Sequence, residues 1–372
     1  MNIILLSGGS GKRLWPISDE IRSKQFLKIF RREDGTRESM VQRMYRMIRN
    51  ADSAARITIA TSEKQVSQIR SQIGRAVDVS VEPDRKDTFP AIALTVAYLV
   101  KNGIDRDEPV VVCPVDPCVG EDYFQCIKEM SDEAGRDGAA NLTLMGIEPD
   151  YPSEKYGYII PTSGEHLSPV SGFREKPDAE TAERFIACGA LWNGGVFAFK
   201  ASYVLRLAAS FLGSSEYQEL FDNYGSFRKT SFDYAVVERE TSINVIRYRG
   251  QWKDLGSWNT FTEGMEVAVT GNIVTNRCDN THVINELNIP IVALGVNNAV
   301  IVATPEGILV SDKKESSNLK EYVSDLRPML EHRPWGEYRI LGYRECGSQQ
   351  SILTRELVIL PERHIGYTMH KK

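Results

Sequence analysis

The stretch IILLSGGSGKRLWP, residues Ile3 to Pro16, places three glycines and two cations within six positions after an apolar run. Glycines after a strand let backbone N–H groups approach phosphate oxygens, and neighbouring cations add positive charge. The stretch therefore predicts a phosphate-binding loop that follows a short strand. Its candidate residues are Leu6, Gly8, Gly9, Gly11, Lys12 and Arg13, and Lys24 adds a further cation thirteen residues after Gly11.

Neither of two familiar phosphate loops fits this stretch. The Walker A loop needs G-x-x-x-x-G-K followed by Ser or Thr, but Leu6 stands five residues before Gly11, and Arg13 follows Lys12. The dinucleotide fingerprint G-x-G-x-x-G fails at Leu14, where its last glycine would stand. A P-loop kinase is therefore disfavoured. For the loop taken alone, a glycine-rich turn with solvated cations remains the alternative interpretation.

The elements that must position this loop alternate between strands and helices from Met1 to about Thr262. Strand-like runs cover residues 2–8, 55–61, 77–83, 109–116, 141–147 and 243–250, and helical patterns cover 39–50, 90–103 and 121–138. Two strand-like stretches end in an aspartate, Asp116 in VVVCPVD and Asp254 in INVIRYRGQWKD. Such alternation predicts an α/β fold with a Rossmann-like, mostly parallel sheet and a ligand site at the carboxyl ends of the strands.

The pattern changes at about Glu263. Residues 263–330 are rich in Ile, Val, Asn and Gly, with very short strand-like runs, and a helix over 315–330 closes them. The tail after Glu331, about 40 residues, is too small for a core of its own, so it either docks or belongs to a domain that is missing. We predict three segments, namely 1–262, 263–330 and 331–372.

Composition excludes several classes of protein. The 372 residues are 42% hydrophobic with a net charge of -5, so no basic excess indicates a nucleic-acid or acidic-membrane partner. No apolar run reaches the roughly 20 residues of a membrane span, and we expect a cytoplasmic protein. The six cysteines form no C-x-x-C pair, so we expect reduced packing residues and no structural zinc.

The opening loop belongs to a longer recognisable pattern. LSGGSGKRLWPISDEIRSKQFLKIF resembles the G-G-x-G-x-R-L signature of sugar-1-phosphate nucleotidyltransferases, and its R-L-W-P-x-S and K-Q-F-L forms resemble those of mannose-1-phosphate guanylyltransferases. Seven further motifs follow in the order of that family. They are EPDRKDTFPAIAL, CPVD, YGYI, FREKPD, LWNGGVFAF, FDYAVVE and WKDLGSW. The resemblance covers residues 1 to about 260. The next segment resembles the small left-handed β-helix of the family, and RPWGEYRIL resembles the start of a phosphomannose-isomerase cupin.

The resemblance implies the reaction and the roles of particular residues. Mannose 1-phosphate would attack the α-phosphorus of GTP, giving GDP-mannose and pyrophosphate, with catalysis by positioning and charge neutralisation. Asp116 and Asp254 would hold Mg²⁺ or another divalent cation, and Arg13 and Lys24 would bind the triphosphate. The implied nucleotide-binding residues are Leu6, Gly8, Gly9, Gly11, Lys12, Arg13, Lys24, Glu82, Lys86, Asp87 and Thr88. The sugar phosphate would contact Lys176 through its phosphate and Glu175, Asn193 and Gly157 through the hexose, while Trp192 and Phe197 are expected in the core.

The sequence departs from the family pattern at three places. Val115 and Pro117 flank Asp116 where Ala and His are usual, and Ser23 replaces the proline before Lys24. The loop expected to contact the base, residues 82–91, is called the base-side loop. It has Lys86-Asp87 in place of Arg-Asn, which changes the hydrogen-bond donors and acceptors that it offers to the base. GTP remains favoured because an Asp can accept from guanine N1–H and N2–H. The alternative nucleotides are UTP, dTTP and CTP. The alternative sugar phosphates are heptose 1-phosphate and glucose 1-phosphate.

A non-catalytic, nucleotide-sugar-binding regulatory homologue is the alternative from another functional class. Retention of both metal aspartates and of the three phosphate-binding cations favours an enzyme. The small molecules GTP and mannose 1-phosphate are the expected partners, and a homodimer stays open. In the tail, His364 and His370 do not predict isomerase activity, because cupin metal ligands come from later strands. The chain is then either a piece of a bifunctional enzyme or one with a vestigial extension.

Overall fold

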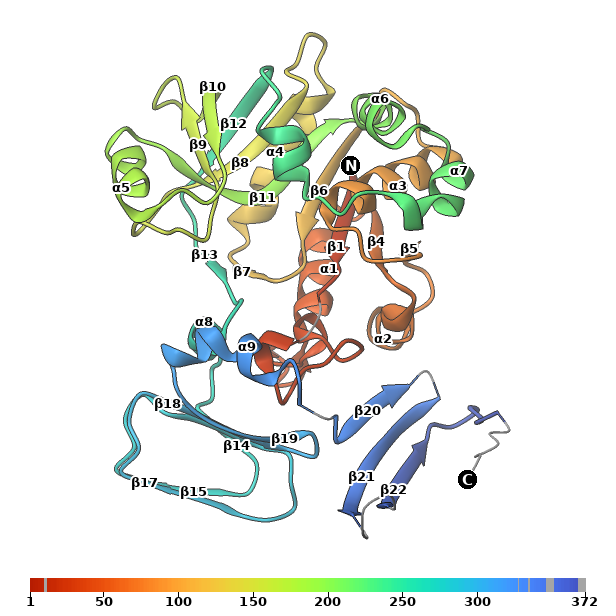
Figure 1. Ribbon diagram of the computed structural model, residues 1–372. Coiled ribbons are helices and arrows are strands. Elements are labelled where there is room, and N and C mark those ends of the chain that lie inside the picture. Colours follow the sequence, from red (N-terminus) through yellow and green to blue (C-terminus); the bar gives the residue numbers. More distant parts are fainter. Residues whose placement is uncertain (10–11, 327, 334, 346–350, 367–372) are drawn as a thin grey trace. The chain divides into compact units, whose positions relative to one another are not determined.

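The computed structural model describes residues 1–9, 12–326, 328–333, 335–345 and 351–366 (Figure 1). Contacts divide the chain into two compact units. Unit 1 comprises Met1–Gly8 and Val41–Lys253, and unit 2 comprises Gly9–Met40 and Asp254–Lys372. These units group residues by contact, so the three segments expected from the sequence stay a prediction. Within the described ranges, no helix combines the length and apolar character needed to cross a membrane.

Unit 1 is built on a nine-stranded sheet (Figure 1). In spatial order its strands are β5 (Asp78–Glu82), β4 (Arg56–Ser62), β1 (Asn2–Ser7), β6 (Pro109–Pro114), β11 (Leu191–Lys200), β8 (Leu142–Ile147), β12 (Ile243–Tyr248), β10 (Leu167–Arg174) and β9 (Tyr158–Pro161). The first four are mutually parallel, and β12 is parallel to β8. Only β11 and β10 run against the other seven. This confirms the predicted mostly parallel α/β sheet.

Helices cover this sheet and complete its core. They are α1 (Met40–Ala51), α2 (Glu63–Ile73), α3 (Thr88–Lys101), α4 (Asp122–Gly135), α5 (Ala179–Ala187), α6 (Ala201–Leu212) and α7 (Tyr217–Asp222), followed by the short turns η3 (Tyr224–Ser226) and η4 (Asp233–Val237). The apolar helix α3 packs against α6 and α7, and α4 packs against β6, β8, β11 and β12. Phe232, just before η4, is fully buried among the rings of Phe89, Phe197 and Phe199.

Unit 2 contains a coil of short strands. They are β14 (Val269–Thr270), β15 (Ile273–Asn276), β16 (His282–Asn285), β17 (Ile291–Leu294), β18 (Ala299–Thr304) and β19 (Gly307–Asp312). Parallel partners are 18 positions apart on three sides of the coil, from 273 to 291, 279 to 297 and 283 to 301. A constant offset means that successive turns of the chain stack, as they do in a β-helix. Val283, Ala293 and Ile301 fill the interior. The expected small β unit is thus confirmed as a strand-rich region.

The amino-terminal part of unit 2 is held against this coil. It contains η1 (Lys12–Leu14), η2 (Lys24–Phe26), β2 (Phe30–Arg31) and β3 (Arg37–Glu38), and α8 (Trp258–Glu263) follows from the carboxyl side. The indole Nε1 of Trp258 donates to the Trp15 carbonyl at 3.0 Å, and Thr304 Oγ1 donates to the Pro16 carbonyl at 3.2 Å. These hydrogen bonds position the stretch that follows the predicted phosphate loop.

The helix expected over 315–330 is shorter in the structure. It consists of η5 (Glu315–Asn318) and α9 (Leu319–Val323). The Ser324 hydroxyl donates to the Lys320 carbonyl at 2.6 Å, a local bond that competes with helix propagation. Pro328 also cannot continue a helix, because its backbone nitrogen has no N–H to donate.

The tail forms an antiparallel sheet of β20 (Leu330–Arg333), β21 (Gly336–Glu345) and β22 (Ser351–Ile359). It docks within unit 2, because the Glu306 carboxylate accepts from Met329 N at 2.9 Å and Leu330 N at 2.6 Å. His332 Nδ1 also lies 2.6 Å from Asp19 Oδ2. His364 is exposed, whereas His370 lies outside the described residues.

Candidate active site

The four residues predicted to bind the sugar phosphate lie together in unit 1. Gly157 precedes β9, Glu175 and Lys176 follow β10, and Asn193 lies in β11. Asn193 N donates to the Gly157 carbonyl at 2.8 Å. Glu175 Oε1 lies 2.5 Å from Lys176 Nζ, so the carboxylate predicted to bind a hydroxyl pairs with the cation predicted to bind the phosphate. The fold thus assembles a subsite from three separate strands.

The amide of Asn193 is held in one orientation. Its Oδ1 accepts from Gly195 N at 3.0 Å, and its Nδ2 donates to Asp233 Oδ1 at 2.6 Å. This network assigns the oxygen and nitrogen ends of the amide. Both ends of the Asn193 amide are therefore fixed by unit 1 itself, and its predicted contact with the hexose stays a prediction.

Asp233 is a site residue that the sequence interpretation missed. It begins η4, a π-helical turn, and such turns recur at functional sites. Burial raises the pKa of Asp233 to about 6, and the nearby Glu175 charge acts in the same direction against the Asn193 hydrogen bond. Asp233 is the aspartate of the motif FDYAVVE, so the sequence marks its position. The motif alone does not indicate what this aspartate contacts.

Lys176 remains a cation at the edge of this subsite. Its backbone has a φ of 46°, in the left-handed region that few residues other than glycine adopt. Partial burial opposes the charge, but the Glu175 carboxylate outweighs it and raises the pKa of Lys176. Its side chain is 52% exposed, with Nζ 6.0 Å from the Tyr234 ring centroid. A half-exposed ammonium of this kind suits an incoming phosphate.

Gly157 has no room for a side chain, and this gives a direct test of the subsite. A Cβ at Gly157 would clash with Glu175 Oε2 and lie 2.7 Å from Phe173 Cζ. We expect Gly157→Ala to displace Glu175 and raise KM for the sugar phosphate by about tenfold, the scale of a steric clash costing about 1–3 kcal/mol. Steady-state kinetics measure this effect. Gly164→Ala is the matched control, because nothing lies within 4 Å of its Cβ position. Equal KM values for the two variants would contradict the assignment.

Three of the predicted nucleotide-binding residues, Leu6, Gly8 and Glu82, lie in or directly after β1 and β5 of unit 1. Glu82, the last residue of β5, accepts from Tyr224 Oη at 2.8 Å, and burial raises its pKa. Glu82 Oε1 lies 3.7 Å from the Cβ position of Gly8, which places the carboxylate beside the start of the predicted phosphate loop. Leu6, in β1, packs against the core, and its carbonyl accepts from Val115 N at 3.3 Å.

Asp87 adopts a conformation that is rare outside glycine. Its φ of 72° and ψ of -174° lie in a region that costs a non-glycine residue about 1–3 kcal/mol. Its carboxylate caps α3 by accepting from Thr88 N at 2.8 Å. Strain of this kind persists where the surrounding structure enforces it, and it clusters at ligand sites.

One segment of unit 1, residues 224–233, holds both the base-side loop and the sugar subsite. Gly225 accepts from Lys86 Nζ at 2.6 Å, and Thr230 N donates to the Lys86 carbonyl at 3.0 Å. Phe232 N donates to Thr88 Oγ1 at 2.8 Å. The next residue is Asp233, the partner of Asn193. Lys86 and Thr88 therefore hold the base-side loop against residues 225–232. Their contact with the nucleotide stays a prediction.

Unit 2 contains the predicted triphosphate-binding residues Arg13 and Lys24 and one of the two aspartates predicted to bind a metal. Lys24 Nζ lies 3.7 Å from Asp254 Oδ1 and 3.5 Å from the Leu255 carbonyl. Arg13 is exposed, and Gln25 Oε1 lies 3.6 Å from the Cβ position of Gly9. Lys12 begins η1, while its side chain and the whole of Gly11 lie outside the described residues. The structure thus brings Lys24 and Asp254 together.

Asp116 belongs to unit 1 and follows the carboxyl end of β6. β7 (Pro117–Val119) begins directly after it and pairs with β13 (Trp252–Asp254), which ends at Asp254, the other aspartate predicted to bind a metal. In the described part of the chain, no group of three His, Cys, Asp or Glu side chains forms a metal cage. Sites that use one or two carboxylates together with substrate phosphates are typical of Mg²⁺.

Comparison with known proteins identifies the family of the chain. Residues 2–270 match the family model described as "Nucleotidyl transferase". The xanthan biosynthesis protein XanB of Xanthomonas campestris pv. campestris (strain B100) is 30% identical over 404 positions, which cover 99% of this chain and 83% of XanB. The mannose-1-phosphate guanylyltransferase RfbM of Salmonella typhimurium (strain LT2) is 27% identical, over 99% of this chain and 82% of RfbM.

Solved structures show the same fold. The structure titled mannose-1-phosphate geranyltransferase from Thermus thermophilus is 26% identical, with a TM-score of 0.72, and the match covers 87% of this chain and 98% of that one. Mannose-6-phosphate isomerase from Helicobacter pylori shares the fold at 23% identity and a TM-score of 0.53, over 68% of this chain and 99% of that one. The family match extends over most of the sequence and includes the assembled subsite of Gly157, Glu175, Lys176 and Asn193. The chain therefore belongs to the nucleotidyl transferase family and is a sugar-1-phosphate nucleotidyltransferase.

Proposed function

We propose that the enzyme transfers a guanylyl group from GTP to mannose 1-phosphate and releases pyrophosphate and GDP-mannose. The observation that carries this proposal is the subsite in unit 1, where Lys176 lies beside Glu175 and the oriented amide of Asn193. Such a subsite offers a cation to a phosphate and both donors and acceptors to hexose hydroxyls. The Salmonella relative RfbM, which is named as a mannose-1-phosphate guanylyltransferase, supports the choice of substrates.

The proposed chemistry needs no protein nucleophile. An oxygen of the sugar phosphate attacks the α-phosphorus of GTP, the bond from that phosphorus to the bridging oxygen breaks, and pyrophosphate leaves with the electron pair. A phosphate dianion is already nucleophilic at neutral pH, so the protein contributes orientation and charge stabilisation. Lys176 would orient the attacking phosphate, and Asn193 and Glu175 would orient the hexose.

Charge on the triphosphate would be offset by Arg13 and Lys24. Arg13 is exposed, so its guanidinium is accessible to phosphate oxygens, which it matches in geometry. Lys24 is 16% exposed and lies against Asp254. We propose that Asp116 and Asp254 supply carboxylate oxygens to Mg²⁺, as the family resemblance implies. When bound, this ion would neutralise charge on the α-phosphoryl group and on the departing pyrophosphate.

A matrix of four nucleoside triphosphates against several sugar 1-phosphates tests the proposal, with pyrophosphate release as the signal. We expect the highest kcat/KM for GTP with mannose 1-phosphate. Turnover with another base or with heptose or glucose 1-phosphate, but none with GTP and mannose 1-phosphate, would overturn the substrate assignment. Nucleotide-sugar binding without turnover in any combination would instead identify a regulatory homologue.

Asp87→Asn tests whether the base-side loop reads guanine. Asparagine tolerates positive φ and caps helices as well as aspartate does, so we expect the midpoint of thermal unfolding to change little. The substitution leaves one acceptor fewer for guanine N1–H and N2–H, so we expect kcat/KM for GTP to fall by about tenfold, the scale of one hydrogen bond to a charged group. Asp137→Asn, at an exposed carboxylate of unit 1 outside the base-side loop, is the control. An unchanged preference for GTP over ATP would contradict base reading by Asp87.

A further inference from the structure

Residues 13–24 of unit 2 begin and end with the two cations proposed to bind the triphosphate, and we call them the cation segment. Their backbone is held by side chains from outside the segment. Trp258 Nε1 donates to the Trp15 carbonyl at 3.0 Å, and Thr304 Oγ1 donates to the Pro16 carbonyl at 3.2 Å. Pro16 is buried, and α9 packs against η1. The first half of the cation segment is therefore fixed by α8, α9 and the turn between β18 and β19, residues 304–307.

The ring of Trp15 lies directly against Gly307, the first residue of β19. A Cβ at Gly307 would lie 2.5 Å from Trp15 Cζ2 and 2.8 Å from Trp15 Cη2. Nonbonded carbon atoms lie about 3.5–4.0 Å apart at their best separation, so only glycine leaves room for the indole. The glycine therefore lets the β18–β19 turn approach the cation segment closely.

Glu306, also in the β18–β19 turn, contacts the same indole. The side chain of Trp15 donates to the Glu306 carboxylate, and burial raises the pKa of Glu306 against this and its other hydrogen bonds. Glu306 Oε2 also accepts from Met329 N at 2.9 Å and from Leu330 N at 2.6 Å. These two backbone donors fix the carboxylate independently of Trp15. A fixed acceptor restricts the orientation of the indole that donates to it.

The second half of the cation segment is also held to the coil of strands. Asp19 Oδ1 accepts from Ile21 N and Arg22 N, both at 2.7 Å. The Arg22 guanidinium donates to both oxygens of Glu286, at 3.0 Å and 2.7 Å. Glu286 directly follows β16 of the coil. The coil therefore holds the cation segment near Lys24 as well as near its start.

We propose that the β18–β19 turn is a positioning element for triphosphate binding, in which Gly307 and Glu306 act on the cation segment through Trp15. The proposal rests on the proposed function, because it takes Arg13 and Lys24 as the residues that bind the triphosphate. Gly307 and Glu306 are positioning residues, and neither contacts the nucleotide. They keep the two cations at the spacing that the phosphates require, and a misplacement of about 1 Å can lower a rate about a hundredfold.

Gly307→Ala tests the contact between the turn and the indole. The added methyl group displaces Trp15, so we expect KM for GTP to rise by about tenfold, the scale of overpacking by one methyl group. KM for mannose 1-phosphate should stay unchanged, because the sugar subsite belongs to unit 1. Gly342→Ala, in β21 of unit 2, is the matched control, since nothing lies within 4 Å of its Cβ position. A fall in thermal stability with no change in KM for GTP, or an equal rise in both KM values, would overturn the proposal.

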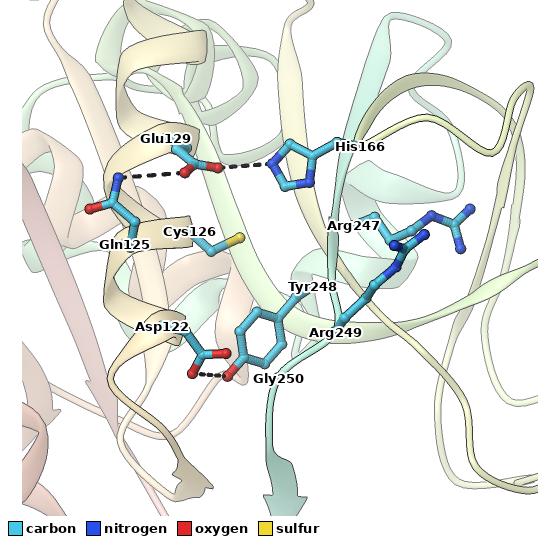
Figure 2. Close-up of a pocket in the computed structure, with 9 residues that line it drawn as sticks. All are labelled: Asp122, Gln125, Cys126, Glu129, His166, Arg247, Tyr248, Arg249 and Gly250. Atoms are coloured by element: carbon cyan, nitrogen blue, oxygen red, sulfur yellow. Dashed lines mark hydrogen bonds and ion pairs between the residues drawn. The ribbon is translucent and has the colours of Figure 1, made fainter.

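A double-mutant cycle tests whether Glu306 acts through Trp15. Glu306→Gln keeps the size of the side chain but removes its charge and one acceptor, and Trp15→Phe keeps a ring but removes the N–H donor. Each should raise KM for GTP by up to about tenfold, the scale of a hydrogen bond to a charged group, and the double variant should do no more. Additive effects would overturn the proposal. The control is Glu129→Gln in unit 1, whose carboxylate lies 2.9 Å from His166 Nε2 and accepts from Gln125 (Figure 2).

Calorimetric titration of the full chain with GTP and Mg²⁺ separates this proposal from the proposed function. Titration needs no turnover, so weaker GTP binding by Gly307→Ala and Glu306→Gln than by wild type would uphold the positioning role even if the turnover matrix showed no reaction. Where that matrix selects another base, its triphosphate replaces GTP in both measurements. Equal affinities in wild type and both variants would overturn the positioning role alone. Absence of triphosphate binding by the wild type would overturn both proposals.

Discussion

Replacing Asp254 with asparagine is expected to lower kcat by about two to three orders of magnitude, the loss typical of removing one group that stabilises transition-state charge. The carboxylate lies 3.7 Å from Lys24 Nζ at the end of β13 and is 37% exposed. Asparagine keeps the size of the side chain but removes its charge, so a bound Mg²⁺ would lose an anionic ligand. The loss should appear in kcat because charge develops on the triphosphate only as the bond breaks.

The fold of the Asp254→Asn variant should stay intact. Partly exposed ion pairs contribute only about 0–1 kcal/mol to stability, so the midpoint of thermal unfolding should hardly change. Asp325→Asn is the control, because this carboxylate is exposed and also lies in unit 2. Steady-state kinetics with saturating GTP and mannose 1-phosphate give the comparison. A kcat within twofold of the wild type would refute the metal-binding role.

The first half of the sheet could be predicted from the sequence because each of its strands is a local apolar run. β1, β4, β5 and β6 match the expected runs within one or two residues. β11 was not expected as a strand, although it lies between β6 and β8 and is antiparallel to both. Its Gly194 and Gly195 fall where the register with β8 shifts, so they interrupt the periodic pattern that marks a strand.

The residues of the sugar subsite could be predicted only through their motifs. Glu175 and Lys176 carry no periodic signal of their own, and their ion pair with each other says nothing about Asn193. Asp233 could not be assigned, because its role depends on a contact with Asn193, forty residues earlier in the chain. The positive φ of Asp87 likewise results from contacts of its neighbours with residues 225–232, which no local pattern encodes.

Asp233→Asn should change how stability depends on pH. Burial raises the pKa of Asp233 from 3.8 to about 6, so between these values the folded chain binds more protons at this site than the unfolded chain. The stabilisation is therefore fully present below pH 4 and is lost as the pH rises through 6. Two pKa units correspond to about 3 kcal/mol of free energy of unfolding. Asparagine does not titrate, and its oxygen can still accept from Asn193 Nδ2.

Urea unfolding of wild type and Asp233→Asn at pH 4, 5, 6 and 7 measures this effect. We expect the variant to gain stability relative to wild type as the pH rises, by up to about 3 kcal/mol across the series. Asp150→Asn, at an exposed carboxylate of unit 1, should show no such trend.

The ionisation of Asp233 should also alter substrate binding, because an ionised Asp233 holds the Asn193 amide more strongly than a neutral one does. Above pH 6, KM for mannose 1-phosphate should therefore be higher in the variant than in wild type. Parallel stability curves for the two proteins would show that folding does not raise the pKa of Asp233, and equal KM values above pH 6 would show that Asp233 does not orient Asn193.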